Sequence, residues 1–174
     1  AWQGTLSDDL VAGRALAALG RVEFEPGAMV AARVDYDWPA LLEFVRRQFT
    51  IGRFYAPRWW AAGSLFACLH QGVFWIGLAL APWAARGTWL AAATGAAAGL
   101  YGLQVLRSGL RQDAARRFWP EHALEQRAAR RFDFVLAPLA GLLAAWGFAS
   151  ALAGSTISWR GWRYRLHPGG TITV

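Results

Sequence analysis

The chain has 174 residues, of which 56% are hydrophobic and only 17% are charged. A soluble domain usually has about a quarter of its residues charged, so this composition argues against an ordinary soluble protein. The net charge of +7 comes entirely from arginine. Because the arginines lie beside apolar stretches, we interpret the charge as attraction to an anionic membrane surface and not to nucleic acid. The single cysteine, Cys68, excludes an intrachain disulfide and a cysteine-based metal site.

The first 57 residues read as the soluble part of the protein. A Ser-Asp-Asp sequence at residues 7–9 precedes apolar residues at helical spacing, which predicts a helix that ends at Gly20. Residues 21–25 and 28–34 predict two short strands. The sequence begins in what resembles the middle of a domain, so we expect the N-terminal portion of this domain to lie outside the chain.

Residues 38–56 predict an amphipathic helix that lies in the membrane interface. Arginines and apolar residues are interleaved along it, and an Arg-Trp-Trp sequence follows at residues 58–60. Tryptophan prefers the headgroup level, which favours the interface over the alternative, an ordinary surface helix. Arg46 and Arg47, followed by Gln48, suit the binding of a diphosphate, but they equally suit anionic lipid headgroups.

Three apolar stretches follow, at residues 59–83, 89–106 and 134–154, and none of them contains an ionised side chain. A helix of roughly 20 apolar residues spans the hydrocarbon core of a bilayer, so each stretch predicts a transmembrane helix. His70 and Gln71 are polar residues inside the first stretch, where they are either a functional pair or a helix–helix hydrogen bond. The expected organisation is a soluble segment at 1–57, a membrane region at 58–154 and a basic, aromatic tail at 155–174.

The arginines also predict an orientation in the membrane. Residues 107–133 contain seven arginines and four acids, whereas the connection near Arg86 contains a single charge. The positive-inside rule therefore places residues 1–58 and 107–133 in the cytoplasm, and we expect a bacterial inner membrane. Three crossings would leave the tail outside, although it carries three arginines. A re-entrant third segment would remove this conflict.

The tail predicts a small β-hairpin, because residues 164–166 and 171–174 flank a His-Pro-Gly-Gly sequence at 167–170. The chain has no glycine-rich phosphate loop, no Ser-His-Asp arrangement and no zinc-ligand pattern. Composition and spacing therefore leave the chemistry open. A carboxylate at a helix start, such as Asp9, is more often an N-cap than a general base.

The order of these features resembles the C-terminal half of ceramide glucosyltransferases and related membrane-bound family 2 glycosyltransferases. This chain contains, in the same order, a Ser-Asp-Asp helix start, an interface helix with Arg-Arg-Gln and three apolar spans. The most specific part is the run ISWRGWRYRL at residues 157–166 with Gly-Gly-Thr at 169–171, which is similar to the end of the animal enzymes. The resemblance covers nearly the whole chain and implies a mainly α integral membrane protein. It implies the C-terminal remnant of a GT-A α/β domain, an interface helix, three transmembrane helices and a hairpin tail.

The resemblance also assigns roles to residues. Asp9 falls on the family's general base, with Asp8 beside it. In the family's Gln/Arg-x-x-Arg-Trp motif for the donor diphosphate, Arg47 matches the arginine, while Phe44 and Gln48 depart from the pattern. Further candidates for substrate binding are Arg46, Gln48, Arg163 and Tyr164.

The implied reaction is an inverting transfer of a sugar, with glucose from UDP-glucose expected, to a lipid hydroxyl such as that of ceramide. The intact enzyme would use Mg or Mn through an Asp-x-Asp-type motif that this chain lacks, and the chain alone should be inactive. Its expected partners are a nucleotide sugar donor, a lipid acceptor and membrane lipids. The alternatives are another lipid or polysaccharide transferase of family 2, or a non-enzymatic scaffold or transport module. A polysaccharide synthase would be expected to keep the complete Gln-x-x-Arg-Trp motif.

Overall fold

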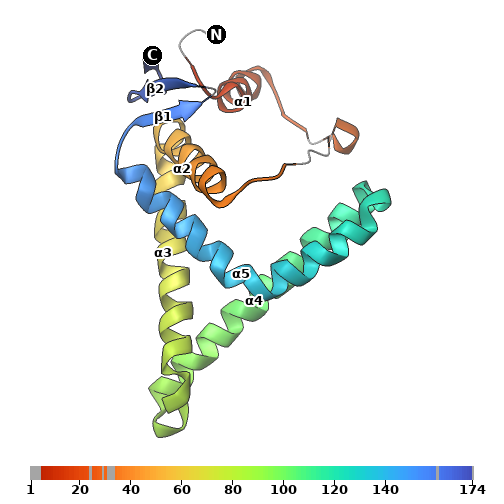
Figure 1. The fold of residues 1–174 in the computed structure, drawn as a ribbon, viewed down its shortest axis with the longest axis vertical. Helices are drawn as coiled ribbons and strands as arrows, with labels where there is room; N and C mark the ends of the chain where they lie inside the picture. The colour runs from red at the N-terminus through yellow and green to blue at the C-terminus, as the bar shows by residue number, and fades with distance from the viewer. Residues whose placement is uncertain (1–4, 24, 29, 31–33, 160, 174) are drawn as a thin grey trace. The chain divides into compact units, whose positions relative to one another are not determined.

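The computed structural model describes residues 5–23, 25–28, 30, 34–159 and 161–173. Its elements, in chain order, are α1 (Asp8–Leu19), η1 (Pro26–Ala28), α2 (Trp38–Tyr55), α3 (Pro57–Leu80), η2 (Ala81–Arg86), α4 (Thr88–Phe118), η3 (Pro120–His122), α5 (Ala123–Leu152), β1 (Thr156–Trp159), β2 (Trp162–Leu166) and β3 (Ile172–Thr173) (Figure 1). The described chain is therefore mainly helical, as predicted.

The two helices predicted before the first span are confirmed as α1 and α2. The hydroxyl of Ser7 caps α1 by accepting a hydrogen bond of 3.4 Å from the backbone N–H of Leu10. The carboxylate of Asp37 caps α2 by accepting one of 2.8 Å from Ala40, with Pro39 in the first turn. Both ends follow the local capping signals of the sequence.

The strand predicted at 21–25 is wrong for the residues described there. Residues 21–23 and 25 have no regular structure, and η1 follows directly. An alternating pattern forms a strand only where a neighbouring strand can pair with it, and none of the described strands pairs with this segment. Of the strand predicted at 28–34, Ala28 lies in η1, residues 30 and 34 are irregular, and the others lie outside the described residues.

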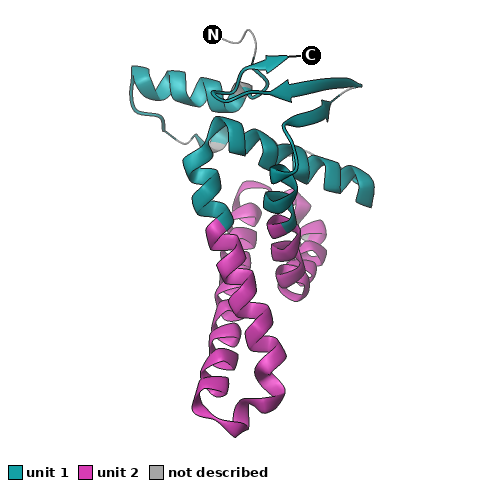
Figure 2. Cartoon of the chain, turned by 90° about the vertical axis from the view of Figure 1, so that its left-hand side faces the viewer, with its two compact units in different colours: residues 1–64, 146–174 teal, residues 65–145 magenta. Residues whose placement is uncertain are grey.

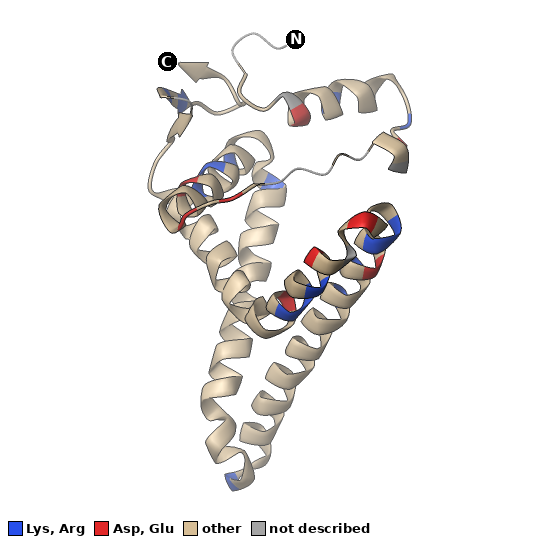
Figure 3. Cartoon of the chain, turned by 45° about the vertical axis from the view of Figure 1, so that its right-hand side comes forward, with Lys and Arg blue, Asp and Glu red and all other residues tan. Residues whose placement is uncertain are grey.

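Three helical stretches, Pro57–Arg86, Thr88–Phe118 and Leu124–Leu152, are long and apolar enough to cross a membrane. The protein is therefore interpreted as a membrane protein. The predicted span boundaries at 106 and 134 mark changes of polarity inside longer helices, because the arginine-rich connection is itself largely helical. Arginine, glutamine and alanine are good helix formers, so this connection continues the helices on both sides. Figure 3 shows that charged residues gather on the ends of α4 and α5 that meet at η3.

The described chain divides into two compact units, residues 1–64 with 146–174, and residues 65–145 (Figure 2). The core of unit 1 contains Tyr55, Ile157 and Leu166, whose exposed fractions are 2%, 1% and 2%. The side chains of Leu6 and Val11 pack against this cluster. Segments from both ends of the chain therefore share one core.

The tail forms a three-stranded antiparallel sheet in the order β1-β2-β3. The predicted hairpin corresponds to β2 and β3, and β1 is an additional strand. Guanidinium groups of α2 tie the end of α5 and the sheet to the helix: Arg46 donates to the carbonyl of Thr156 at 3.1 Å, and Arg53 donates to that of Ala151 at 2.7 Å.

In unit 2, α4 runs antiparallel to α3. Gly77 of α3 faces Ala93 and Ala97 of α4, and the ring centroids of Phe74 and Tyr101 are 6.4 Å apart. A Cβ at Gly77 would collide with the carbonyl oxygen of Ala93, so glycine is what allows the close approach. Helix α5 then pairs with the second half of α4, because the hydroxyl of Tyr101 donates to the carbonyl of Phe134 and Gln112 donates to Asp133, both at 2.8 Å.

Candidate functional site

The candidate catalytic residue Asp9 lies in the first turn of α1, and its side chain is exposed. The positive end of the helix dipole favours a carboxylate at this position. The segment before the helix is held in place by Tyr55, whose phenol oxygen accepts a hydrogen bond of 2.7 Å from the backbone N–H of Leu6. The side chain of Asp8, the second candidate, lies outside the described part of the chain.

Asp9 lines a small cavity of about 170 Å³, which we call the polar pocket. Its lining residues come from α1 and the segment before it, from α2 and from β1: Leu6, Ser7, Asp9, Arg47, Gln48, Ile51 and Trp159. The guanidinium carbon of Arg47 lies 5.6 Å from the ring centroid of Phe44, a cation–π contact that orients the arginine. The pocket thus combines one carboxylate, one cation, one amide and one indole.

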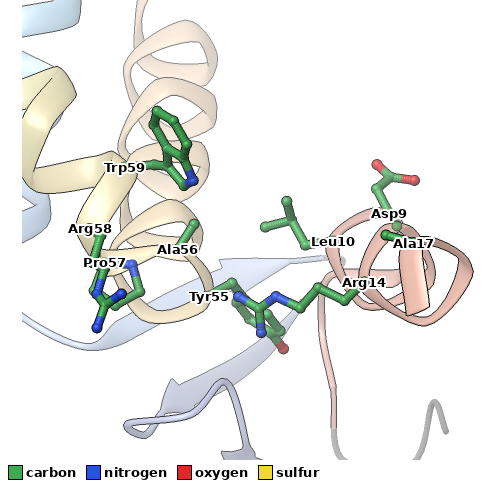
Figure 4. Close-up of a pocket in the computed structure, with 10 residues that line it drawn as sticks. Asp9, Leu10, Arg14, Ala17, Tyr55, Ala56, Pro57, Arg58 and Trp59 are labelled. Atoms are coloured by element: carbon green, nitrogen blue, oxygen red, sulfur yellow. The ribbon is translucent and has the colours of Figure 1, made fainter. Parts of the chain in front are cut away.

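Asp9 also lines a second, larger cavity of about 580 Å³, which we call the apolar pocket. It lies between α1, the end of α2 and the first turn of α3, and its other residues are Leu10, Gly13, Arg14, Ala17, Tyr55, Ala56, Pro57, Arg58 and Trp59. In Figure 4 the side chain of Arg14 extends from α1 toward Tyr55. The carboxylate of Asp9 points away from both of these residues. The apolar pocket therefore lies where the first long apolar helix begins.

Three of the other sequence candidates lie elsewhere in unit 1. Arg46 makes the hydrogen bond to Thr156 described above and lies 3.8 Å from the carboxylate of Glu43, and it does not line either pocket. Arg163 is exposed on β2, where it is opposite Ser158. Tyr164 is the next residue along β2 and packs against the buried cluster. Of the predicted substrate-binding residues, the structure brings Arg47 and Gln48 together with Asp9.

The residue that sequence analysis missed is Trp159. Side chains alternate along a strand, so Trp159 shares a face of β1 with the buried Ile157, while Ser158 and its partner Arg163 share the opposite face. This alternation brings Trp159 to the polar pocket and keeps Arg163 away from it. The residues of β1 have a strand-like sequence, but the sequence does not show which strand pairs with β1 or which pocket its side chains line.

Among the described residues, no group of three or more histidine, cysteine, aspartate or glutamate side chains is placed to hold a metal ion. Comparisons of the chain with protein-family models, with curated proteins and with solved structures find no match.

Proposed function

We propose that this chain is the membrane part of a lipid glycosyltransferase, with Asp9 as the general base. The observation that carries the proposal is that one acidic residue, Asp9, lines two unlike cavities. The polar pocket, with Arg47 and Gln48, suits the phosphates of a nucleotide sugar, and the apolar pocket suits the alkyl part of a lipid. A reaction between a water-soluble donor and a membrane acceptor requires such a junction.

Arg47 is the group that would contact the diphosphate of the donor. A guanidinium group offers paired donors that match phosphate oxygens, and the stacking on Phe44 limits its freedom. Gln48 adds an amide that can hydrogen-bond to a sugar or phosphate oxygen. Arg46 is already engaged with Thr156 and Glu43, so it is proposed to stabilise the fold and not to bind the donor.

The apolar pocket would receive the acceptor from the bilayer. It opens beside the first turn of α3, where Trp59 has 82% of its surface exposed. An exposed tryptophan at the start of a membrane helix is typical of the headgroup level. A lipid hydroxyl held at this level would meet the carboxylate of Asp9 after a rotation of its side chain, which points away from Arg14 and Tyr55 in Figure 4.

The proposed step is a single displacement at the anomeric carbon. The carboxylate of Asp9 accepts the proton of the lipid hydroxyl while the hydroxyl oxygen bonds to the anomeric carbon. The bond from that carbon to the diphosphate breaks, the nucleoside diphosphate leaves, and the configuration inverts. A divalent ion, whose motif the resemblance places outside this chain, would neutralise the leaving diphosphate. Glucose as the sugar and ceramide as the acceptor rest on the resemblance alone.

We further infer that the chain crosses the membrane twice. The tail and the helices α1 and α2 share one core, so they lie on the same side of the membrane. Because α4 runs antiparallel to α3, it returns to that side, and α5 must then begin and end there. Helix α5 contains Pro138 and bends partway along its length (Figure 1), as a re-entrant helix does. The arginines of residues 107–133 and of the tail make this side the cytoplasm.

The test is an assay of the purified protein, expressed from its complete reading frame, in nanodiscs. Radiolabelled UDP-sugars are offered with ceramide, diacylglycerol or polyisoprenol acceptors. We expect transfer to one lipid, with kcat lowered roughly 10²–10⁴-fold in Asp9→Asn, which removes the base but keeps its size. Arg47→Ala should raise the KM for the donor, and the matched variant Arg46→Ala should lower stability instead.

Two results would contradict the proposal. Wild-type activity in a well-folded Asp9→Asn protein would remove the assigned base. Absence of transfer with every donor and acceptor pair, in protein that is folded and monodisperse, would favour a scaffold or transport module.

A further inference from the structure

Unit 2 contains a cavity of about 380 Å³ between α3, α4 and α5, which we call the membrane cavity. Its lining is mainly apolar, with four polar side chains, and comprises Phe66, Ala67, His70, Gln71, Leu100, Leu103, Gln104, Arg107, Gly141 and Ala144. All of these residues belong to unit 2, so the cavity is a property of that unit alone. It is independent of both pockets that Asp9 lines.

Two of the polar groups already have partners. The amide of Gln71 accepts a hydrogen bond of 3.0 Å from the indole N–H of Trp75, and its nitrogen lies 3.2 Å from Nδ1 of His70. Gln71 is 6% exposed, and its amide occupies the space that a side chain at residue 141 would fill. Both hydrogen bonds stay within α3, and the amide of Gln71 packs against Gly141 of α5, so the described contacts do not include the hydrogen bond between helices that the sequence offered as one alternative.

Gln104 differs from this pair. Its Oε1 is buried and has no hydrogen-bond donor among the residues that the structure describes. A buried acceptor without a donor costs about 1–3 kcal/mol, and a bilayer offers no bulk water to satisfy it. Gln104 also lines the membrane cavity. A rotation of its terminal amide about a soft torsion is what would turn this oxygen toward a ligand there.

Arg107 is the fourth polar group and follows directly after the apolar stretch 89–106. Its side chain is exposed and has no ion pair in the described part of the chain. The next arginine along α4, Arg111, forms an ion pair with Asp133. Arg107 therefore offers a cation to a cavity whose lining is mainly apolar.

We propose that the membrane cavity binds a phospholipid whose headgroup is anionic and carries hydroxyl groups, such as phosphatidylglycerol. Arg107 binds the phosphate, a headgroup hydroxyl donates to Oε1 of Gln104, and an acyl chain lies along Phe66, Leu100 and Leu103. The charge selects an anionic lipid. The acceptor on Gln104 selects a headgroup that brings a donor, and the apolar walls select a lipid over a soluble phosphate.

The test is native mass spectrometry of the full-length protein, delipidated in detergent and titrated with lipids of identical acyl chains. Phosphatidylglycerol should bind roughly tenfold more tightly than phosphatidylcholine, with phosphatidic acid between them. Arg107→Ala should lower the binding of phosphatidic acid to that of phosphatidylcholine, and it should weaken the binding of phosphatidylglycerol, which keeps only its contact with Gln104. Gln104→Leu should remove only the advantage of phosphatidylglycerol over phosphatidic acid.

Matched variants control for non-specific effects. Arg86→Ala removes the arginine of η2, at the opposite end of α4, and should leave the lipid preference unchanged. Ala144→Phe fills the cavity without altering charge and should weaken phosphatidylglycerol binding, whereas Ala140→Phe, at an exposed site on the same helix, should not.

Three outcomes would overturn the proposal: a wild type without preference for phosphatidylglycerol over phosphatidylcholine, an Arg86→Ala variant that loses as much binding as Arg107→Ala, or an Ala144→Phe variant that binds normally. Tight binding of soluble glycerol 3-phosphate would show that the site recognises a free phosphate and not a lipid. None of these measurements requires transferase activity, so the proposed lipid site and the proposed function can be disproved independently of each other.

Discussion

The phenol oxygen of Tyr55 accepts a hydrogen bond of 2.7 Å from the backbone N–H of Leu6, a residue 49 positions earlier in the chain. Tyr55 is 2% exposed and also lines the apolar pocket. This one side chain therefore joins the end of α2 to the segment that leads into α1. We expect the position of Asp9 in the polar pocket to depend on that connection.

Replacing Tyr55 by phenylalanine should destabilise unit 1 and weaken the site together. The partly buried N–H of Leu6 loses its acceptor, which costs about 1 kcal/mol, and this should lower the Tm by a few degrees. The control is Tyr164→Phe, because Tyr164 packs on the same cluster and the described structure gives its hydroxyl no hydrogen bond. Tryptophan fluorescence on heating measures both variants. Equal Tm values for Tyr55→Phe and the wild type would show that this hydrogen bond does not hold the segment.

Gly170→Ala should be more destabilising than Gly169→Ala. Both glycines have positive φ angles, +83° and +87°, which cost a non-glycine residue about 1–2 kcal/mol. Only at Gly170 would the added Cβ lie 2.7 Å from a ring carbon of Tyr55, and such overpacking costs about 1–3 kcal/mol more. Thermal unfolding of the two variants separates the backbone strain from the collision. Identical losses would mean that the tail is not packed on Tyr55.

The twice-crossing topology predicts which residues share a side of the membrane. In a Cys68→Ser background, single cysteines at Pro168 and Glu121 should react with an impermeant maleimide in inside-out vesicles, and one at Ala85 should react in spheroplasts. Pro168 lies in the turn before β3, Glu121 in η3 and Ala85 in η2, and all three are exposed. Labelling of Pro168→Cys from the same side as Ala85→Cys would establish three crossings.

Trp159→Ala should raise the KM for the sugar donor by roughly threefold to tenfold, with a smaller change in kcat. An aromatic face in the polar pocket contributes about 0.5–1.5 kcal/mol when a ring stacks on it. The matched control is Trp162→Ala, the residue opposite Trp159 in the sheet, which lines neither pocket. Steady-state kinetics at saturating acceptor distinguishes the two. An unchanged KM in Trp159→Ala would remove this residue from the donor site.

Several elements of the structure follow from local sequence signals. Ser7 and Asp37 cap α1 and α2 as their side chains predict, because a capping hydrogen bond joins residues only three positions apart. The failed strand at 21–25 shows the limit of such signals. A strand depends on a partner elsewhere in the chain, and a local pattern carries no information about that partner.

Only part of the candidate site could be predicted, because contacts between residues distant in the chain bring its side chains together. The arginine pair at residues 46 and 47 is visible in the sequence, but the sequence does not show that the two side chains make different contacts. Arg46 is turned to Thr156, 110 residues away, and Arg47 to the polar pocket with Asp9. Trp159 reaches the same pocket because it follows the buried Ile157 by two residues along β1 and therefore shares its face.

The sequence by itself determined the membrane character of the chain, its long helices and its two helix caps, because hydropathy and capping act between residues close in the chain. The tertiary structure decided that the tail shares a core with α1 and α2, that Asp9 lines two unlike cavities, and that Gln104 and Arg107 meet in a third. The shared core and the pockets of Asp9 join residues tens of positions apart, and the third cavity adds residues of α3 and α5 to Gln104 and Arg107 of α4, so side-chain packing fixes these relationships.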